Sequence, residues 1–190
     1  MIGELPRSVT VNGRNYAVRT DFRDILRILT AFSDPELEDS EKVYVCLVIF
    51  FKKYDTIPRR DYESAFKEAL HFIDRNVSSD GNHDADTRSP RVMDWEQDEA
   101  LLFPAVNKVA GFEVRSVKYL HWWTFLGYYM EISDGVFANV LNLRLKKAKH
   151  KKLEKWEQEY WNSNKDICVL KEKLSAEEQA ERDRINDLLG

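Results

Sequence analysis

The chain has 190 residues, of which 43% are hydrophobic and 33% are charged, and its formal net charge is −4. A chain of this length and apolar content buries a core of its own, which excludes wholesale disorder. The mildly acidic balance gives no overall attraction to nucleic acid or to an anionic membrane surface.

The first predicted element is a β-hairpin in the segment SVTVNGRNYAV. Asn12-Gly13 is the preferred pair for a two-residue type I′ turn, in which both residues need positive φ. That turn pairs Val9 with Tyr16 and places the apolar side chains of both strands on one face. Because an isolated hairpin is marginal in water, we expect this face to pack on other elements.

Three helices follow in the predicted order of elements. Thr20 is expected to cap the first helix and Ser40 the second, and the segment RDYESAFKEALHFIDRNV has the spacing of a third. The apolar run Val43 to Phe51 also fits a buried strand, but the cap before it and the lysines after it favour a core helix. This run is far shorter than the roughly 18 residues of a membrane span, so no membrane partner is expected.

Cysteine usage gives little scope for covalent or metal chemistry. Cys46 lies inside the apolar run and is expected to be a small buried hydrophobe, and Cys168 is the only other cysteine. Two distant cysteines form neither a disulfide framework nor a zinc site. The N-terminal MIGELPRSVTV lacks the basic and apolar regions of a secretory signal, so a reducing cytoplasm is the expected compartment.

The segment SSDGNHDADTRSP, residues 78 to 90, is predicted to be a flexible polar linker. Its alternating carboxylates raise the alternative of a calcium loop. However, the glycine and glutamate positions of an EF-hand are absent, which favours a solvated linker. We expect neither a metal nor a cofactor.

The next helix is predicted to begin near Asp94 and to stop at Gly111, with Pro104 kinking or breaking it. Asp94 and Glu96, with the neighbouring acids, could form an acid–base pair. Acids in a first helical turn are explained more simply by the positive end of the helix dipole. A hydrolase that uses Asp94 or Glu96 with His121 is therefore only a third hypothesis.

The most aromatic stretch, LHWWTFLGYY, is predicted to lie in a helix capped by Ser116. A helix that is apolar around most of its circumference is surrounded by protein, whereas a stacking platform needs exposed rings beside cationic groups. His121 is accordingly expected to be a hydrogen-bonded core residue rather than a ligand or a base. The predicted structural core is His121, Trp122, Trp123 and Phe125.

A long helix is predicted from Val136 onward, and its segment RLKKAKHKKLEK, residues 144 to 155, is densely basic. Such a block either binds phosphates or forms a solvated face that pairs with acidic groups, and the acidic chain favours the second interpretation. Ser175 and Glu178 form a capping box for a last helix with a thin apolar stripe, which suits docking onto a partner. The candidate partner-binding residues are Arg144, Lys146, Lys147, Lys149, Lys151, Lys152, Ile185, Leu188 and Leu189.

These elements predict a mainly α fold: a multi-helix globular domain with a small N-terminal β-hairpin and a long, charged C-terminal helical region. We divide it into residues 1–77 (hairpin and helices), 78–90 (linker), 91–165 (aromatic-rich helices packing on the first part) and 166–190 (helical tail). No Walker loop, GxGxxG, HExxH, GxSxG or zinc-cluster spacing occurs in the sequence. The expected function is therefore not enzymatic.

The order of LPRSVTVNGRNYAVRTDFRDIL, DWEQDEALLFPAVNKVAG and VKYLHWWTFLGYYMEI, followed by a basic helix, resembles the gp-fifteen-type family of siphophages and prophages. The resemblance covers residues 5 to 32 and is strongest over 94 to 150. Leu120-His121-Trp122-Trp123-Phe125 is its most specific string. Pro104 departs from the pattern, because the family tends to carry an unbroken helix there.

The family is encoded near tail tube and tape-measure genes, so the resemblance implies a non-enzymatic tail-assembly protein in the cytoplasm of the bacterial host. The expected function is a chaperone that binds the tape-measure protein, or a tail tube protein, during tail morphogenesis. Homo-oligomers are compatible with such a role. The alternative is a nucleic-acid-binding helical protein that uses the basic helix 144–155, although the acidic net charge disfavours nucleic acid.

Overall fold

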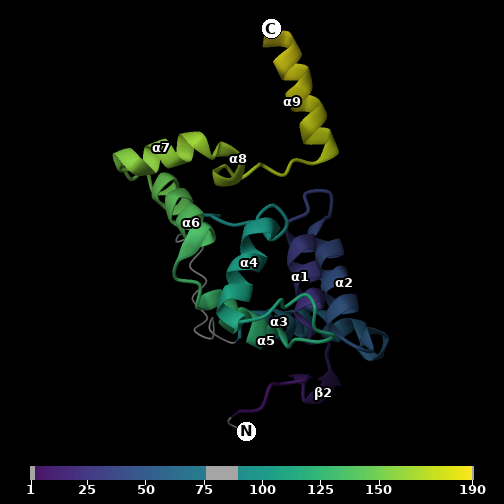
Figure 1. Cartoon of the computed structure of the whole chain (residues 1–190). Helices are drawn as coiled ribbons and strands as arrows, with labels where there is room; N and C mark the ends of the chain where they lie inside the picture. Colours follow the sequence, from purple (N-terminus) through teal and green to yellow (C-terminus); the bar gives the residue numbers. More distant parts are fainter. Residues whose placement is uncertain (1–2, 76–89, 190) are drawn as a thin grey trace.

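The computed structural model describes residues 3–75 and 90–189, and it is mainly α with one small N-terminal hairpin (Figure 1). The predicted linker therefore falls, except for Pro90, outside the described residues, and so does the calcium-loop alternative. The described elements are β1 (Ser8–Val11), β2 (Arg14–Ala17), α1 (Phe22–Phe32), α2 (Asp39–Phe50), η1 (Tyr54–Thr56), η2 (Arg59–Asp61), α3 (Tyr62–Ile73), α4 (Glu99–Ala110), α5 (Trp122–Met130), α6 (Gly135–Ala148), α7 (Lys155–Ser163), α8 (Lys165–Cys168) and α9 (Ala176–Leu189).

The hairpin has the predicted register, with Val9 opposite Tyr16. Asn12 and Gly13 have φ of 47° and 81°, as a type I′ turn requires. The apolar face packs on the helices, where the Tyr16 ring meets Phe51 edge-on at a centroid distance of 6.0 Å. The hairpin is thus stabilised by the helical layer above it.

The first two helices begin one or two residues away from the predicted caps. The Asp21 side chain, rather than Thr20, accepts from the Arg23 amide at the start of α1. The second helix starts after Glu38, which forms a reciprocal capping box with Glu41. The prediction of Ser40 as a cap was therefore wrong, because a glutamate pair satisfies the free amides earlier in the chain.

Helix α4 is continuous through Pro104, so the predicted break was wrong, while the alternative of a kink stays a prediction. It starts at Glu99, later than predicted, because residues 95–98 form turns before it. Gly111 ends it in the left-handed conformation with φ of 77°, as expected for a C-terminal glycine.

The aromatic helix α5 begins at Trp122, six residues after the predicted cap Ser116. Its start is determined by an antiparallel bridge between Asp21 and His121, in which the Phe22 amide donates to Leu120 and the Trp122 amide donates to Thr20. The bridge joins the N-terminal ends of α1 and α5. Tertiary pairing, not a local serine, therefore defines this boundary.

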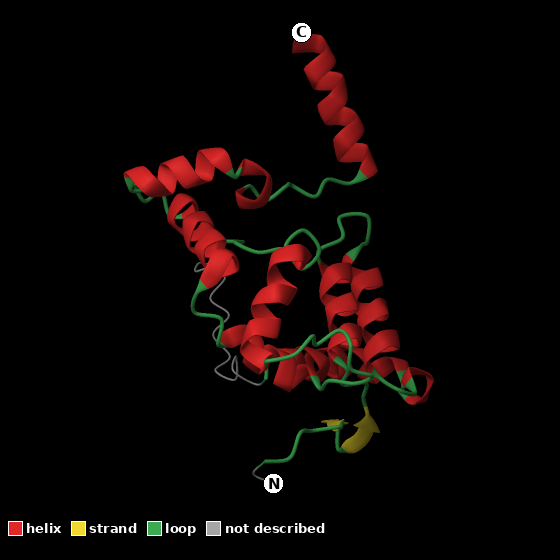
Figure 2. Ribbon diagram, viewed as in Figure 1, coloured by secondary structure: helices red, strands yellow, loops and turns green. Residues whose placement is uncertain are grey.

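The predicted long helix from Val136 is divided into two. Helix α6 ends at Ala148, His150 adopts a left-handed φ of 53°, and α7 starts only at Lys155 (Figure 2). Helices α6 and α7 meet at an elbow, and α8 follows α7 directly. We call residues 169–175, which lead back over the ends of α1 and α4, the strap; helix α9 then projects away from the rest of the molecule (Figure 1).

One large apolar cluster joins the hairpin, α1–α3, α4, α5 and the start of α6. Rings of Phe22 and Phe125 stack at its centre with a centroid distance of 4.6 Å. A second, smaller cluster lies between α6, α7 and α8 and contains Leu143 and Trp161. The two clusters leave the surfaces of the elbow and of α9 outside the core.

Candidate functional site

His121 is an interior residue whose two ring nitrogens are both occupied. Its side chain is 2% exposed, Nδ1 accepts from the Trp123 amide at 3.0 Å, and Nε2 donates to the Pro6 carbonyl at 2.9 Å. This arrangement requires the neutral tautomer. Burial, together with repulsion from Arg7, holds the pKa of His121 below its usual 6.5, against the opposing bond to Pro6. His121 therefore cannot serve as the base of the hydrolase hypothesis.

Trp122 and Trp123, two other residues of the predicted core, cap the C-terminal end of α3. Trp122 and Phe125 are buried and Trp123 is half-buried. The indole N–H groups of Trp122 and Trp123 each donate at 2.8 Å, to the carbonyls of Ile73 and Phe72 respectively. These carbonyls lie at the C-terminal end of α3, where helical partners are missing. The two indole hydrogen bonds thus hold the start of α5 against the end of α3.

Asp94 is buried and acts as an anchor for the strap. It accepts from the backbone amides of Glu96 and Gln97, and it forms ion pairs with Arg91 and with Lys173, the latter at 3.1 Å. Burial opposes the charged form of Asp94, but the bonds from Gln97 and Lys173 outweigh it, so the pKa of Asp94 lies below its usual value. These contacts give this carboxylate a structural role.

Arg144 does not belong to the exposed basic face in which it was predicted, because its side chain points into the protein and is only 5% exposed. Its guanidinium forms a two-point ion pair with Asp98 and donates to three backbone carbonyls. Lys146 also has a partner within the protein, since it forms an ion pair with the buried carboxylate of Glu157. These two residues hold α4, α6 and α7 together and are not free to bind a partner.

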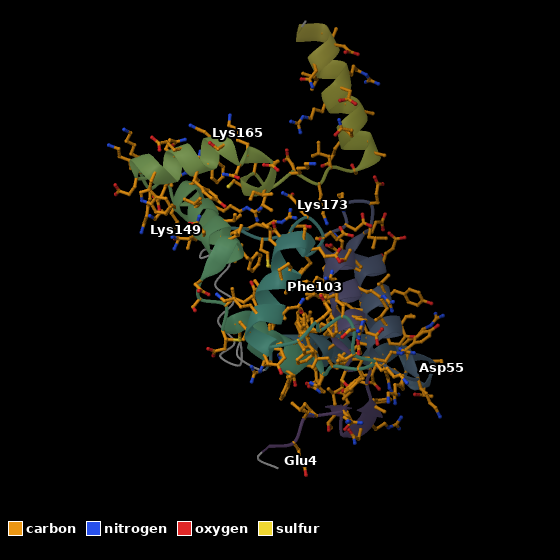
Figure 3. The ribbon with its side chains drawn as sticks, viewed as in Figure 1. Glu4, Asp55, Phe103, Lys149, Lys165 and Lys173 are labelled. Carbon is orange, nitrogen blue, oxygen red and sulfur yellow. The ribbon has the colours of Figure 1, made fainter. Side chains whose placement is uncertain are left out.

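The remaining basic residues gather at the elbow, and Figure 3 marks Lys149 at the end of α6. The elbow surface is a hollow of about 1110 Å³ in the turn between α6 and α7. It is lined by Lys147, Lys151, Lys152 and Lys155, by Glu154 and Glu159, and by His150. Lys147 lies over the Trp161 ring at 4.4 Å from its centroid. A continuous basic helix over residues 144 to 155, as the nucleic-acid alternative assumed, is not present.

Helix α9 exposes the other predicted binding residues. Ile185 is 47% and Leu188 is 81% exposed, whereas the side chain of Leu189 lies outside the described part of the structure. Together with Glu172 and Leu174 of the strap, α9 lines a hollow of about 760 Å³. This tail hollow has an apolar floor and a mostly acidic rim.

A third surface, which the sequence did not reveal, is a groove of about 590 Å³ between α1 and α4. Its floor is formed by Phe22, Leu26, Trp95 and Phe103. The rings of Phe22 and Phe103 are 6.3 Å apart, and Figure 3 marks Phe103 between the two helices. The contributing helices are far apart in the sequence, and the half-buried Leu26 on the apolar stripe of α1 was the only local signal.

The two walls of the groove carry opposite charges. Helix α1 contributes Arg23 and Arg27, and the α4 side contributes Glu96 and Glu99. Arg115, from the loop after α4, lies over the Phe103 ring at 4.7 Å and within 3.9 Å of Glu99. An apolar floor between a wall with two arginines and a wall with two glutamates and Arg115 favours an occupant that is itself amphipathic.

Side chains that are bonded to other parts of the protein lie toward both ends of the groove. At one end Arg23 lies over the Phe22 ring and donates to the Arg115 and Val117 carbonyls at 3.0 and 2.7 Å. At the other end Lys173 of the strap bonds Glu96 at 2.6 Å and Ser33 at 3.2 Å. The space between these ends spans α1 from Phe22 to Thr30, which is roughly 12 Å of helix.

Within residues 3–75 and 90–189, no group of three or more His, Cys, Asp or Glu side chains is arranged to hold a metal ion. In the same ranges, no helix has the length and hydropathy of a membrane span.

The fold and these surfaces describe a mainly α protein whose distinctive exterior features are a charged groove and two oppositely charged hollows. Residues 1–170 match the family described as Bacteriophage Gp15 protein, so the chain belongs to this bacteriophage family. No curated protein and no solved structure matches the chain. The family match includes the groove and the elbow, whereas α9 lies beyond its end.

Proposed function

We propose that the protein is a phage tail-assembly chaperone that binds a helical segment of the tape-measure protein in the groove between α1 and α4. The observation that carries the proposal is the groove itself, which has an aromatic floor between two helices. Helix-in-groove recognition uses such a surface to hold the apolar stripe of an amphipathic helix. Membership of a bacteriophage family supports a role in virion assembly.

The dimensions of the groove define the ligand. About 12 Å of floor accommodates roughly two turns of a partner helix, which present apolar residues at i, i+3, i+4 and i+7. The basic wall around Arg27 favours acidic residues on one flank of that helix, and Glu99 favours basic residues on the other. This asymmetry selects one orientation of the partner.

Binding of this kind shields apolar surface without any chemical step. A tape-measure protein exposes long helical stripes before tail tube subunits polymerise around it, and exposed apolar patches lead to aggregation. Occupation of short stretches by many copies of the chaperone would keep the tape measure soluble in the host cytoplasm. The arriving tube subunits would then displace the chaperone.

The test is co-expression with the tape-measure protein of the same phage genome, followed by pull-down at low salt. Thr30 lines the groove, so the substitution Thr30→Arg fills it with a long side chain without removing a buried apolar group. We expect the wild type to retain the tape-measure protein and Thr30→Arg to lose it. The matched control is Thr10→Arg on the exposed side of β1, which should retain it. Absence of a complex with correctly folded wild type counts against the proposal.

A further inference from the structure

The elbow surface and the tail hollow have opposite charges and lie in separate parts of the chain. The elbow combines four lysines, Lys147, Lys151, Lys152 and Lys155, with two glutamates. The tail hollow combines four glutamates, Glu172, Glu177, Glu178 and Glu181, with two arginines. These lysines, arginines and glutamates sum to a charge of +2 on the elbow and −2 on the tail hollow. Opposite potentials of this kind steer two surfaces together.

Helix α9 lacks the tertiary support that a helix of its length needs. Every residue from Ala176 to Leu188 is exposed, and the helix projects from the body in Figure 1. A lone helix of about 14 residues is marginal in water, because most helical stability in proteins comes from packing of one face. Its capping box at Ser175 and Glu178 and the bond from the Ala176 amide to Glu36 hold its first turn, and Arg182 in the next turn reaches Glu172 of the strap at 3.5 Å. The rest of the helix needs a surface to cover it.

The face of α9 that we expect a partner to cover has an acidic half and an apolar half. Glu177 and Glu181 are one turn apart, and Ile185 and Leu188 continue the same stripe at i+4 and i+3 spacing. A matching surface therefore offers cations beside an apolar residue. The elbow offers both, since Leu153 lines it beside Lys151 and Lys152.

We propose that the protein self-associates head to tail, with α9 of one copy docked on the elbow of a second copy. The contact is heterologous, because it joins two different surfaces. A pair of copies therefore keeps one unused tail and one unused elbow, and further copies add until a ring closes or a chain grows. Since the groove between α1 and α4 takes no part in the contact, self-association is independent of the proposed tape-measure binding.

The test uses the full chain in sedimentation velocity at about 50 mM and about 500 mM salt, where screening differs strongly. We expect oligomers at low salt that dissociate as salt rises. Two charge-reversal variants, Glu177→Lys/Glu181→Lys in the tail and Lys151→Glu/Lys152→Glu in the elbow, change only exposed side chains. Glu178 is left intact because it caps α9. Each variant alone should weaken self-association by about tenfold or more, because like charges then face each other.

The decisive sample is an equal mixture of the two variants. The reversed tail is complementary to the reversed elbow, and the unaltered tail of one variant still fits the unaltered elbow of the other, so the mixture should recover oligomers. The control Asp55→Lys/Glu63→Lys makes the same change in net charge as the tail variant, on exposed positions elsewhere, and should associate like the wild type. A wild type that is monomeric at low salt, equal association of all variants, or a mixture that stays monomeric each overturns the proposal.

Discussion

Arg144 and Asp98 form a buried two-point ion pair, in which Nη1 lies 2.7 Å from Oδ2 and Nη2 lies 2.8 Å from Oδ1. The pair joins α6 to the residue that precedes α4. The same guanidinium donates to the carbonyls of Val92, Ile167 and Cys168. One side chain thus connects α6, the entry to α4 and the chain around α8.

The first prediction concerns the stability that depends on this pair. Arg144→Met keeps an unbranched side chain but leaves the Asp98 carboxylate buried without a cation. Removing one partner of a buried pair costs about 3–5 kcal/mol, so we expect the free energy of unfolding in urea to fall by that amount. Lys149→Met, at an exposed position after α6, should change it by no more than about 0.5 kcal/mol. Equal unfolding midpoints for the wild type and Arg144→Met would contradict the role assigned to the pair.

The second prediction uses the two cysteines as reporters. Burial raises the pKa of the Cys46 thiol to about 12, and burial also raises the pKa of Cys168. Because the thiolate is the reactive form, both thiols should react slowly with a disulfide reagent at about pH 8 in the folded protein. Arg144→Met removes the bond to the Cys168 carbonyl and should accelerate labelling of Cys168 more than labelling of Cys46. Mass spectrometry identifies the labelled residue, and equal acceleration at both cysteines would argue for global unfolding instead.

The third prediction concerns the pH dependence of stability through His121. Its folded pKa is below 6.5 because of burial, so the unfolded chain takes up the proton first as pH falls. The stabilisation is complete above 6.5 and is lost as pH falls through the folded pKa. Urea unfolding at about pH 7.5 and about pH 5.5 should therefore show lower stability at the acidic value.

The matched variant for this measurement is His121→Asn. Asparagine provides an acceptor for the start of α5 but does not titrate, so the difference in stability between the two pH values should shrink. The exposed His71 on α3 provides the control substitution His71→Asn, which should leave that difference unchanged. An undiminished pH dependence in His121→Asn would exclude His121 as its source.

The fourth prediction concerns Pro104, which lies exposed inside the continuous helix α4. A proline in a helix interior removes one backbone hydrogen bond and crowds the preceding turn, at a cost of about 3 kcal/mol relative to alanine. Part of this cost is offset because proline also restricts the unfolded chain. Pro104→Ala should raise the free energy of unfolding by about 1–3 kcal/mol. A lower thermal midpoint for the variant would show that the proline ring makes a packing contact that outweighs the strain.

Local patterns were sufficient to predict the mainly α class, the hairpin register and the elements through α5. The Asn12-Gly13 turn and the apolar stripes act over a few residues, so they can be read from the sequence. The boundary of α5 could not, because a backbone bridge to Asp21, a hundred residues earlier in the chain, determines it. Caps that depend on such pairing have no local signal.

Two features of the C-terminal half were predicted wrongly for a related reason. A lysine-rich run has high helix propensity and contains neither glycine nor proline, so nothing in it marks the end of α6. The elbow is instead stabilised by contacts such as Lys146 with Glu157 and Lys147 with Trp161. Arg144 looked like part of a basic face, but its buried partner Asp98 lies 46 residues away. The groove was missed because its two walls come from separate helices.

The central claim, that the groove binds a helical segment of the tape-measure protein, is tested most directly by site-specific photo-crosslinking. A photoreactive phenylalanine analogue is placed at Leu26 in the groove or at Tyr44, which is exposed on α2. Each form is co-expressed with the tape-measure protein of the same phage, irradiated and mapped by mass spectrometry. We predict crosslinks from position 26 to amphipathic segments of the tape measure and none from position 44. Crosslinks from position 44 alone, or none from either position in a complex that still forms, would contradict the account.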